Sequence, residues 1–202
     1  MLTPETLLRE IFGFDSFRAG QRDIIDTINA GENVLAIMPT GGGKSLCYQL
    51  PALTRDGLTV VLSPLIALMR DQVRALQSSG VAAGALTSSN TSDENQNIFD
   101  QLNTGTLRIL YISPERLAST AMQSALKRFN IKMIAVDEAH CVSQWGHDFR
   151  PDYLRIGELG RKLNVPLAAF TATADLKTRQ EIIERLFNRR TPKIFLHGFD
   201  RP

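Results

Sequence analysis

Short runs of consecutive apolar residues recur along the chain, separated by stretches in which apolar residues return every three or four positions. An apolar run of four to eight residues is typical of a strand buried on both faces, as in a parallel sheet. The spacing in the intervening stretches is typical of amphipathic helices. We therefore expect strands at Asn33–Met38, Leu58–Ser63, Ala82–Thr87, Leu107–Ser113, Lys132–Asp137, Leu167–Thr171 and Lys193–Leu196.

Helices are expected before the first strand and between the later ones. Thr3 or Thr6 can cap a first helix, and the isoleucine stripe of a second helix ends at Gly31, a common helix stop. Strands that alternate with helices over short connections predict one α/β domain across residues 1–202, with a mostly parallel sheet covered on both faces. The later helices are expected at Lys44–Leu53, Ile66–Ser79, Asp93–Asn103, Pro114–Arg128, Tyr153–Lys162 and Leu176–Phe187.

Composition and charge exclude several protein classes without indicating a function. Hydrophobic residues make up 43%, and 23 basic against 21 acidic residues give a net charge of +2. These values argue against disorder, collagen and coiled coil, and they do not by themselves indicate a nucleic-acid binder. Neither a membrane-spanning run nor a secretory signal is expected. Cys47 and Cys141 lack metal-ligand spacing, so we expect reduced, packed thiols in a reducing compartment and no structural metal.

A glycine-rich segment, MPTGGGKS at 38–45, joins an expected strand to an expected helix. In that context, glycines let backbone N–H groups surround a phosphate, and the helix N-terminus adds further donors. Lys44 would then place its charge on the β- and γ-phosphates, and Ser45 would offer its hydroxyl to Mg²⁺. The alternative is a glycine-rich turn with a surface lysine. The candidate nucleotide ligands in this segment are Thr40, Gly41, Gly42, Gly43, Lys44 and Ser45.

Two acids, Asp137 and Glu138, follow an apolar strand. An acid at the carboxyl end of a parallel strand points into the crevice where such sheets bind ligands. Asp137 would hold Mg²⁺, through water, and Glu138 would orient and deprotonate an attacking water. The alternative is a pair of capping acids at a turn. With Lys44, these acids are the candidate catalytic residues.

Several blocks of the chain together resemble superfamily 2 helicases, specifically the RecQ family of DNA helicases. The resemblance covers nearly the whole chain, and the block at 141–151, CVSQWGHDFRP, is the most discriminating. The other blocks are FRAGQ at 17–21, the phosphate segment, SPL at 63–65, SPER at 113–116, DEAH at 137–140 and TAT at 171–173.

The resemblance implies the first RecA-like P-loop NTPase domain of a 3′→5′ DNA helicase, with ATP and Mg²⁺ as cofactors. Such an enzyme couples ATP hydrolysis to translocation on single-stranded DNA and to unwinding in recombination and repair. Single-stranded and duplex DNA and a second RecA-like lobe are the implied partners, with a monomer and no membrane association. We expect a cytoplasmic, nucleoid protein in a bacterium and a nuclear one in a eukaryote.

An adenine pocket is expected upstream of the phosphate segment. The Gln21 amide can pair with adenine N6 and N7 together. By resemblance, Phe14 and Arg18 stack on the two faces of the base, a role that suits aromatic and guanidinium planes. The family often has Tyr where this chain has Phe14, so stacking is kept and a hydroxyl is lost. The alternative is that Phe12, Phe14 and Phe17 pack in the core and Gln21 lies on a helix surface.

The segment after the acid pair gathers aromatic and basic side chains, including the single tryptophan, Trp145. Aromatic and arginine planes stack on bases without reading sequence. The resemblance implies that this aromatic loop ties DNA binding to ATP hydrolysis. The alternative is a satellite apolar cluster with Trp145 in its core. The candidate coupling and DNA-binding residues here are His140, Trp145, His147, Phe149 and Arg150, and the two histidines are expected to bind no metal.

Further DNA contacts are expected where other strands end and helices begin. Hydroxyls and helix N-termini in these places can hold phosphates of a single strand, and they also act as plain helix caps. The TAT block can bridge the Mg²⁺ site to the DNA side. Ser88 and Asn90 are weaker candidates. The expected residues are Ser63, Pro64, Arg116, Thr171 and Thr173.

The chain ends at FDRP, 199–202, which resembles the segment leading into the second lobe. That lobe normally supplies an arginine finger, and the zinc-binding and winged-helix regions of the family lie outside this chain. We therefore expect the isolated lobe to bind ATP and Mg²⁺, to hydrolyse ATP slowly or not at all, and not to unwind duplexes. Two other functions stay open: a lobe of an RNA helicase or remodeller, and a nucleotide-gated binding module without turnover.

Overall fold

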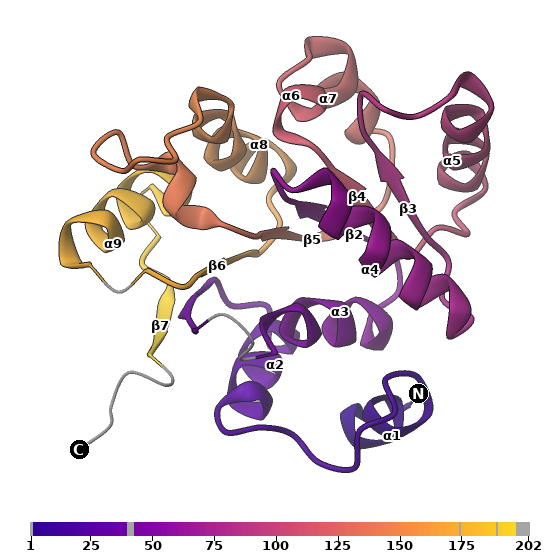
Figure 1. Ribbon diagram of the computed structural model, residues 1–202, viewed down its shortest axis with the longest axis horizontal. Helices are drawn as coiled ribbons and strands as arrows, with labels where there is room; N and C mark the ends of the chain where they lie inside the picture. The colour runs from indigo at the N-terminus through magenta and orange to yellow at the C-terminus, as the bar shows by residue number, and fades with distance from the viewer. Residues whose placement is uncertain (1, 40–42, 174, 189, 197–202) are drawn as a thin grey trace.

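The computed structural model describes residues 2–39, 43–173, 175–188 and 190–196. Within these residues, seven parallel strands form one sheet in the order β3-β4-β2-β5-β6-β1-β7 (Figure 1). The α/β class and all seven expected strands are confirmed. The strands are β1 Val34–Ile37, β2 Leu58–Leu62, β3 Ala83–Leu86, β4 Ile109–Ile112, β5 Ile131–Val136, β6 Leu167–Thr171 and β7 Lys193–Leu196.

Helices fill the connections between the strands. The described α-helices are α1 Pro4–Glu10, α2 Gln21–Asn29, α3 Lys44–Thr54, α4 Ile66–Ser78, α5 Ser92–Thr104, α6 Pro114–Leu117, α7 Thr120–Leu126, α8 Leu154–Leu163 and α9 Leu176–Ile182. One 3₁₀-helical turn follows β5 at Ala139–Val142, and another precedes α8 at Pro151–Tyr153. A π-helical turn at Ile183–Phe187 continues α9.

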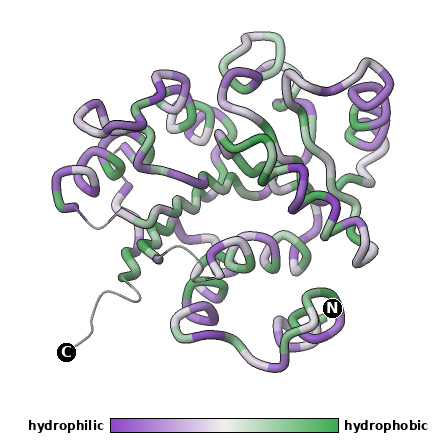
Figure 2. Tube along the Cα trace, viewed as in Figure 1, coloured by the Kyte–Doolittle hydropathy of each residue, from purple (hydrophilic) through white to green (hydrophobic). Residues whose placement is uncertain are grey.

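Helices bury both faces of the sheet. Because successive side chains of a strand point to opposite faces, neighbouring residues pack against different helical layers. In β1, Leu35 and Ile37 join an apolar cluster with α5, α7, α8 and α9, whereas Val34 and Ala36 join a cluster with α2, α3 and α4. In Figure 1, α2 and α3 lie below β5 and β6, and α8 lies above them. Figure 2 shows hydrophobic colour along the strands between the helical layers. The uninterrupted apolar runs are therefore explained by burial on two sides.

Two expected helices are interrupted in the structure. The prediction of one helix over Pro114–Arg128 is wrong, because the Ser119 hydroxyl accepts from Met122 N and starts α7 as a separate helix. The expected helix over Leu176–Phe187 keeps its α-helical geometry only to Ile182 and then widens into the π-helical turn. The prediction of Ser63 as a helix cap is also wrong, because Leu65, two residues later, occupies the cap position of α4.

Other local expectations hold. Thr3 caps α1 by accepting from Thr6 N, and Ser113 caps α6 by accepting from Arg116 N. Cys47 and Cys141 are both free and buried, as expected. Among the described helices, none has the length and apolarity needed to cross a bilayer.

Candidate nucleotide and coupling site

The carboxyl ends of four neighbouring strands bring the expected site residues together. In the order β2-β5-β6-β1, all strands are parallel, so their ends meet at one edge of the sheet. Ser63 follows β2, Asp137 follows β5 and Thr171 ends β6. Lys44 opens α3 on the connection that leaves β1. Thr40, Gly41 and Gly42 lie outside the described residues, so their expected roles stay predictions.

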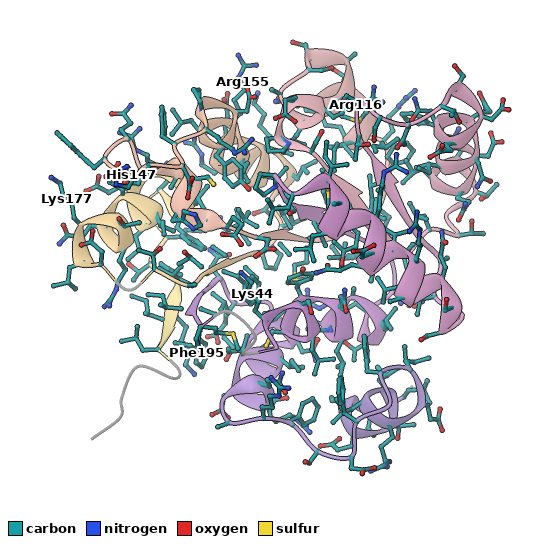
Figure 3. The ribbon with its side chains drawn as sticks, viewed as in Figure 1. Lys44, Arg116, His147, Arg155, Lys177 and Phe195 are labelled. Carbon is teal, nitrogen blue, oxygen red and sulfur yellow. The ribbon has the colours of Figure 1, made fainter. Side chains whose placement is uncertain are left out.

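Lys44 contacts both candidate acids. Its Nζ lies 3.2 Å from Asp137 Oδ1 and 3.2 Å from Glu138 Oε1. Burial opposes the charge of the Lys44 ammonium, but the two carboxylates outweigh it and raise the pKa of Lys44. Burial also raises the pKa of Asp137, although Lys44 lowers it in part. The interpretation of Lys44 as a surface lysine on a plain turn is therefore wrong. Figure 3 shows Lys44 near the middle of the molecule.

The backbone at the acid pair is held in an uncommon conformation. Glu138 has φ 52° and ψ 46°, in the left-handed region that costs an L residue about 1–2 kcal/mol. Glu138 N donates to Asp137 Oδ1 at 3.0 Å, and the Tyr153 hydroxyl donates to the Asp137 main-chain oxygen at 2.9 Å. This geometry turns two adjacent carboxylates toward one lysine, which a simple capping turn does not require.

A pocket of about 410 Å³ lies beside Lys44 and joins the expected phosphate and base residues. Asp137 and Ser45 both line it, so a carboxylate and a hydroxyl face the same space. Hard oxygen donors of this kind fit Mg²⁺. Within the described part of the chain, no cluster of three or more His, Cys, Asp or Glu side chains suggests a structural metal. The described residues that line it are Phe14, Ser16, Arg18, Gln21, Gly43, Lys44, Ser45, Leu46, Tyr48, Leu68, Gln72 and Asp137.

Gln21 connects the base end of the pocket to its phosphate end. Its side chain is buried, with the residue 3% exposed, so its placement on a helix surface is wrong. Gln21 Nε2 donates to the Gly43 main-chain oxygen at 3.0 Å, and Gln21 Oε1 accepts from Arg18 N at 2.8 Å. Gly43 has φ +76°, and a Cβ there would collide with Gln21 Nε2. The backbone conformation therefore favours glycine, and any larger residue would also displace the Gln21 amide.

The three nearby phenylalanines divide between the two interpretations. Phe12 and Phe17 pack against the apolar cluster of α1, α2 and α3, as the core interpretation expects. Phe14 is 52% exposed and lines the pocket, so the core interpretation is wrong for this residue. Its ring is open to a planar ligand, which suits the stacking role.

The aromatic loop is exposed. Trp145 is 73% exposed, so its assignment to an apolar core is wrong. The ammonium of Lys177, on α9, lies 4.0 Å from the centre of the Trp145 ring. His147 and Arg150 are also exposed, whereas Phe149 is half-buried. Figure 3 shows His147 and Lys177 at the same end of the molecule.

His140 links the acid pair to this loop. Its Nδ1 lies 3.0 Å from Thr171 Oγ1 and 3.5 Å from Glu138 Oε2. Its Nε2 lies 3.5 Å from Asp148 Oδ2, in the aromatic loop. One imidazole therefore touches the end of β6, a candidate catalytic acid and the candidate DNA-binding loop.

The remaining DNA candidates are more dispersed. Ser63 is buried, and its hydroxyl accepts from Leu65 N at 3.3 Å, while Pro64 is half-buried beside it. Thr173 N donates to Thr171 Oγ1 at 3.2 Å, which keeps the TAT block compact. Figure 3 shows Arg116, which lies on α6, well apart from His147. Contact of these residues with DNA stays a prediction.

The comparisons with known proteins decide the family. The DEAD/DEAH box helicase family matches residues 18–182, which include both acids, the aromatic loop and the pocket residues other than Phe14 and Ser16. The chain belongs to this family. ATP-dependent DNA helicase RecQ of Pasteurella multocida is 48% identical over 97% of this chain and 31% of its own length. RecQ of Haemophilus influenzae is 45% identical over 99% of the chain and 32% of its own length. The resemblance to RecQ helicases is thus confirmed, and the chain spans about a third of these relatives.

Solved structures confirm the helicase fold. The helicase domain of Pyrococcus furiosus Hef covers 92% of this chain with a TM-score of 0.69 and 20% identity, the match taking 38% of that chain. The DUF1998 helicase MrfA bound to DNA covers 97% with a TM-score of 0.74 and 18% identity, over 29% of that chain. At these identities the likeness speaks for the fold alone.

Some of the residues that line the pocket of this DEAD/DEAH box helicase domain were not predicted from the sequence. Leu68 and Gln72 reach the pocket from α4, and Tyr48 reaches it from α3. Gln72 Oε1 accepts from the hydroxyls of Tyr48 at 3.0 Å and Tyr111 at 2.6 Å. A signal was present, because Gln72 is a polar residue three positions from Met69 on the buried stripe of α4.

Proposed function

We propose that this chain is the ATP-binding lobe, residues 1–202, of a RecQ-type 3′→5′ DNA helicase that translocates on single-stranded DNA and unwinds it in recombination and repair. The observation that carries the proposal is the chain of contacts through His140. It joins Glu138, the candidate base for ATP hydrolysis, to Asp148 of the exposed aromatic loop. If DNA binding moves the loop, the movement of Asp148 would be transmitted through His140 to the Glu138 carboxylate.

Different residues of the pocket bind the adenine, the phosphates and the attacking water. Phe14 and Arg18 hold the faces of adenine, and Gln21 pairs with its edge. Lys44 leaves the acid pair for the β- and γ-phosphates, which frees Glu138 to accept a proton from the attacking water. Ser45 and Asp137 would hold Mg²⁺, which would supply neutralising charge for the phosphates.

Turnover requires more than this lobe. A second RecA-like lobe is proposed to close over the pocket and to supply an arginine finger, worth about 10³–10⁵ in rate in related phosphoryl-transfer enzymes. The isolated chain should therefore bind ATP with Mg²⁺, act as a monomer and turn over weakly. The DNA strand would pass over the strand ends near Ser63, Thr171 and Trp145.

Steady-state ATPase assays of the full-length protein, with and without single-stranded DNA, test the proposal. Glu138→Gln should lower turnover by about 10²–10⁴-fold while nucleotide binding persists, since only proton transfer is removed. Glu184→Gln, an exposed site on the turn after α9, is the matched control. Unchanged turnover in Glu138→Gln would instead favour a nucleotide-gated binding module.

The DNA arm of the test uses the aromatic loop. Trp145→Ala should reduce the DNA-stimulated rate far more than the DNA-free rate, because an exposed indole contributes through base stacking and not through the core. Equal loss of both rates would contradict the coupling role. Stimulation by RNA as strong as that by DNA would favour an RNA helicase.

A further inference from the structure

The first residues of the aromatic loop, Ser143 and Gln144, form hydrogen bonds with a buried carboxylate on α9. Glu181 is only 8% exposed. Its Oε1 accepts from the Ser143 hydroxyl at 2.8 Å, and its Oε2 accepts from Gln144 N at 3.1 Å. Both donors belong to the start of the loop. Hydrogen bonds to an ionised acceptor are about twice as strong as neutral ones, so these two bonds fix Ser143 and Gln144 firmly.

The Ser143 hydroxyl links Glu181 to the backbone of Trp145 through two hydrogen bonds. It donates to Glu181 and accepts from Trp145 N at 3.3 Å. Arg185 Nε lies 3.6 Å from Oε2, the oxygen that accepts from Gln144 N, and balances the charge of the carboxylate. The carboxylate therefore binds residues 143 and 144 directly, and it reaches residue 145 through the Ser143 hydroxyl.

A second contact comes from the same face of α9. Lys177 precedes Glu181 by four residues, one helical turn, and so lies on the same side. Its ammonium covers one face of the Trp145 ring. An indole that is 73% exposed has little packing to fix it, so its position depends on such contacts. Together they place the ring before any base arrives, which lowers the ordering cost of binding.

We propose that Glu181 is a positioning residue that anchors the aromatic loop to α9 and sets the place of Trp145 for DNA-dependent stimulation of ATP hydrolysis. The coupling part of this inference rests on the proposed function. The anchoring part stands on the contacts alone. Glu181 lies on the helix that follows the TAT block, so it also ties the loop to the element next to Thr171.

Tryptophan anisotropy tests the anchor in the chain itself, because Trp145 is its single tryptophan. Glu181→Ala should lower the steady-state anisotropy of Trp145, and the exposed Glu184→Ala should leave it unchanged. Glu181→Gln keeps one acceptor oxygen and should give an intermediate value. Ser143→Ala combined with Glu181→Ala should add little to either single change, since both break one network. Unchanged anisotropy in Glu181→Ala, with the fold retained by circular dichroism, would overturn the anchor.

The ATPase of the full-length protein tests the coupling. Glu181→Ala should raise the concentration of single-stranded DNA needed for half-maximal stimulation about fivefold or more, the lower range of ordinary coupling between sites. Its DNA-free rate should match that of Glu184→Ala, and Glu181→Gln should partly restore the response. If single-stranded DNA stimulates the ATPase of the wild type and of Glu181→Ala at the same concentrations, the role of Glu181 in coupling is overturned. A wild type that DNA does not stimulate would instead contradict the proposed function, and the anisotropy would still decide the anchor.

Discussion

The ion pairs of Lys44 predict a loss of stability on neutralisation that can be worked from the structure. The Lys44 ammonium lies 3.2 Å from Asp137, and the two side chains are 17% and 2% exposed. At that distance and an effective dielectric constant of about 20, the pair attracts by about 5 kcal/mol before dehydration is counted. Exposed pairs contribute about 0–1 kcal/mol, and stranding a fully buried charge costs about 3–5 kcal/mol. Lys44 retains some solvent, so Lys44→Met should lower the free energy of unfolding by about 2 kcal/mol near pH 8.

The loss should be smaller at acid pH. Burial raises the pKa of Asp137 and the Lys44 charge lowers it, so removal of that charge raises the pKa further. In Lys44→Met, the folded state then binds a proton at Asp137 more readily than the unfolded state. Its stability therefore falls as pH rises from about 4, the ordinary carboxyl value, through the raised pKa. The pKa of Lys44 itself is raised from 10.5, so the wild type keeps the lysine contribution throughout this window.

Urea unfolding near pH 5 and near pH 8, followed by circular dichroism, measures both effects. Lys162→Met is the matched control, because Lys162 pairs with Glu158 at 3.3 Å while both side chains are about half exposed, 46% and 55%. That control should change stability by about 0.5 kcal/mol or less at either pH. A loss in Lys44→Met no larger than in Lys162→Met, or equal at the two pH values, would refute the reasoning.

Three further predictions follow from single contacts. Tyr153→Phe removes the hydroxyl that donates to the buried main-chain oxygen of Asp137 and should lower the free energy of unfolding by about 1–3 kcal/mol in urea titrations. Gly43→Ala should displace the Gln21 amide and weaken the preference for ATP over GTP in competition binding, and an unchanged preference would argue against base reading by Gln21. Burial raises the pKa of the Cys47 thiol to about 12, so the native chain should resist alkylation near pH 8 at this residue until urea unfolds it.

The sequence was a good guide wherever chemistry and position coincide along the chain. Apolar runs predicted the strands because both faces of the sheet are covered, and Asp137 and Glu138 were found because they directly follow such a run. The burial of Gln21 was not predictable in the same way. It depends on a bond to Gly43, a residue brought close only by the fold.

The boundaries that failed have a physical reason as well. Ser119 interrupts an otherwise helical pattern because a serine hydroxyl competes for backbone N–H groups, and sequence spacing alone does not say which use prevails. For Trp145 the sequence predicted a base-stacking loop and left an apolar core as the alternative, since a tryptophan suits either, and its exposure excludes the core. The anchor at Glu181 joins residues 38 positions apart in the chain, beyond any local pattern.

The position of β1 in the sheet has a consequence for how the protein is made. Its neighbours are β6 and β7, so Val34 pairs with Ala168 on one side and Lys193 on the other. About 130 residues separate the end of β1 from the start of β6, and synthesis at about 5–20 residues per second takes roughly 7–26 s to cover them. The strand that leads into the phosphate segment therefore leaves the ribosome long before any partner strand exists. Until then its apolar side chains are open to chaperones or to misassembly, and the nucleotide pocket is among the last parts of the domain to form.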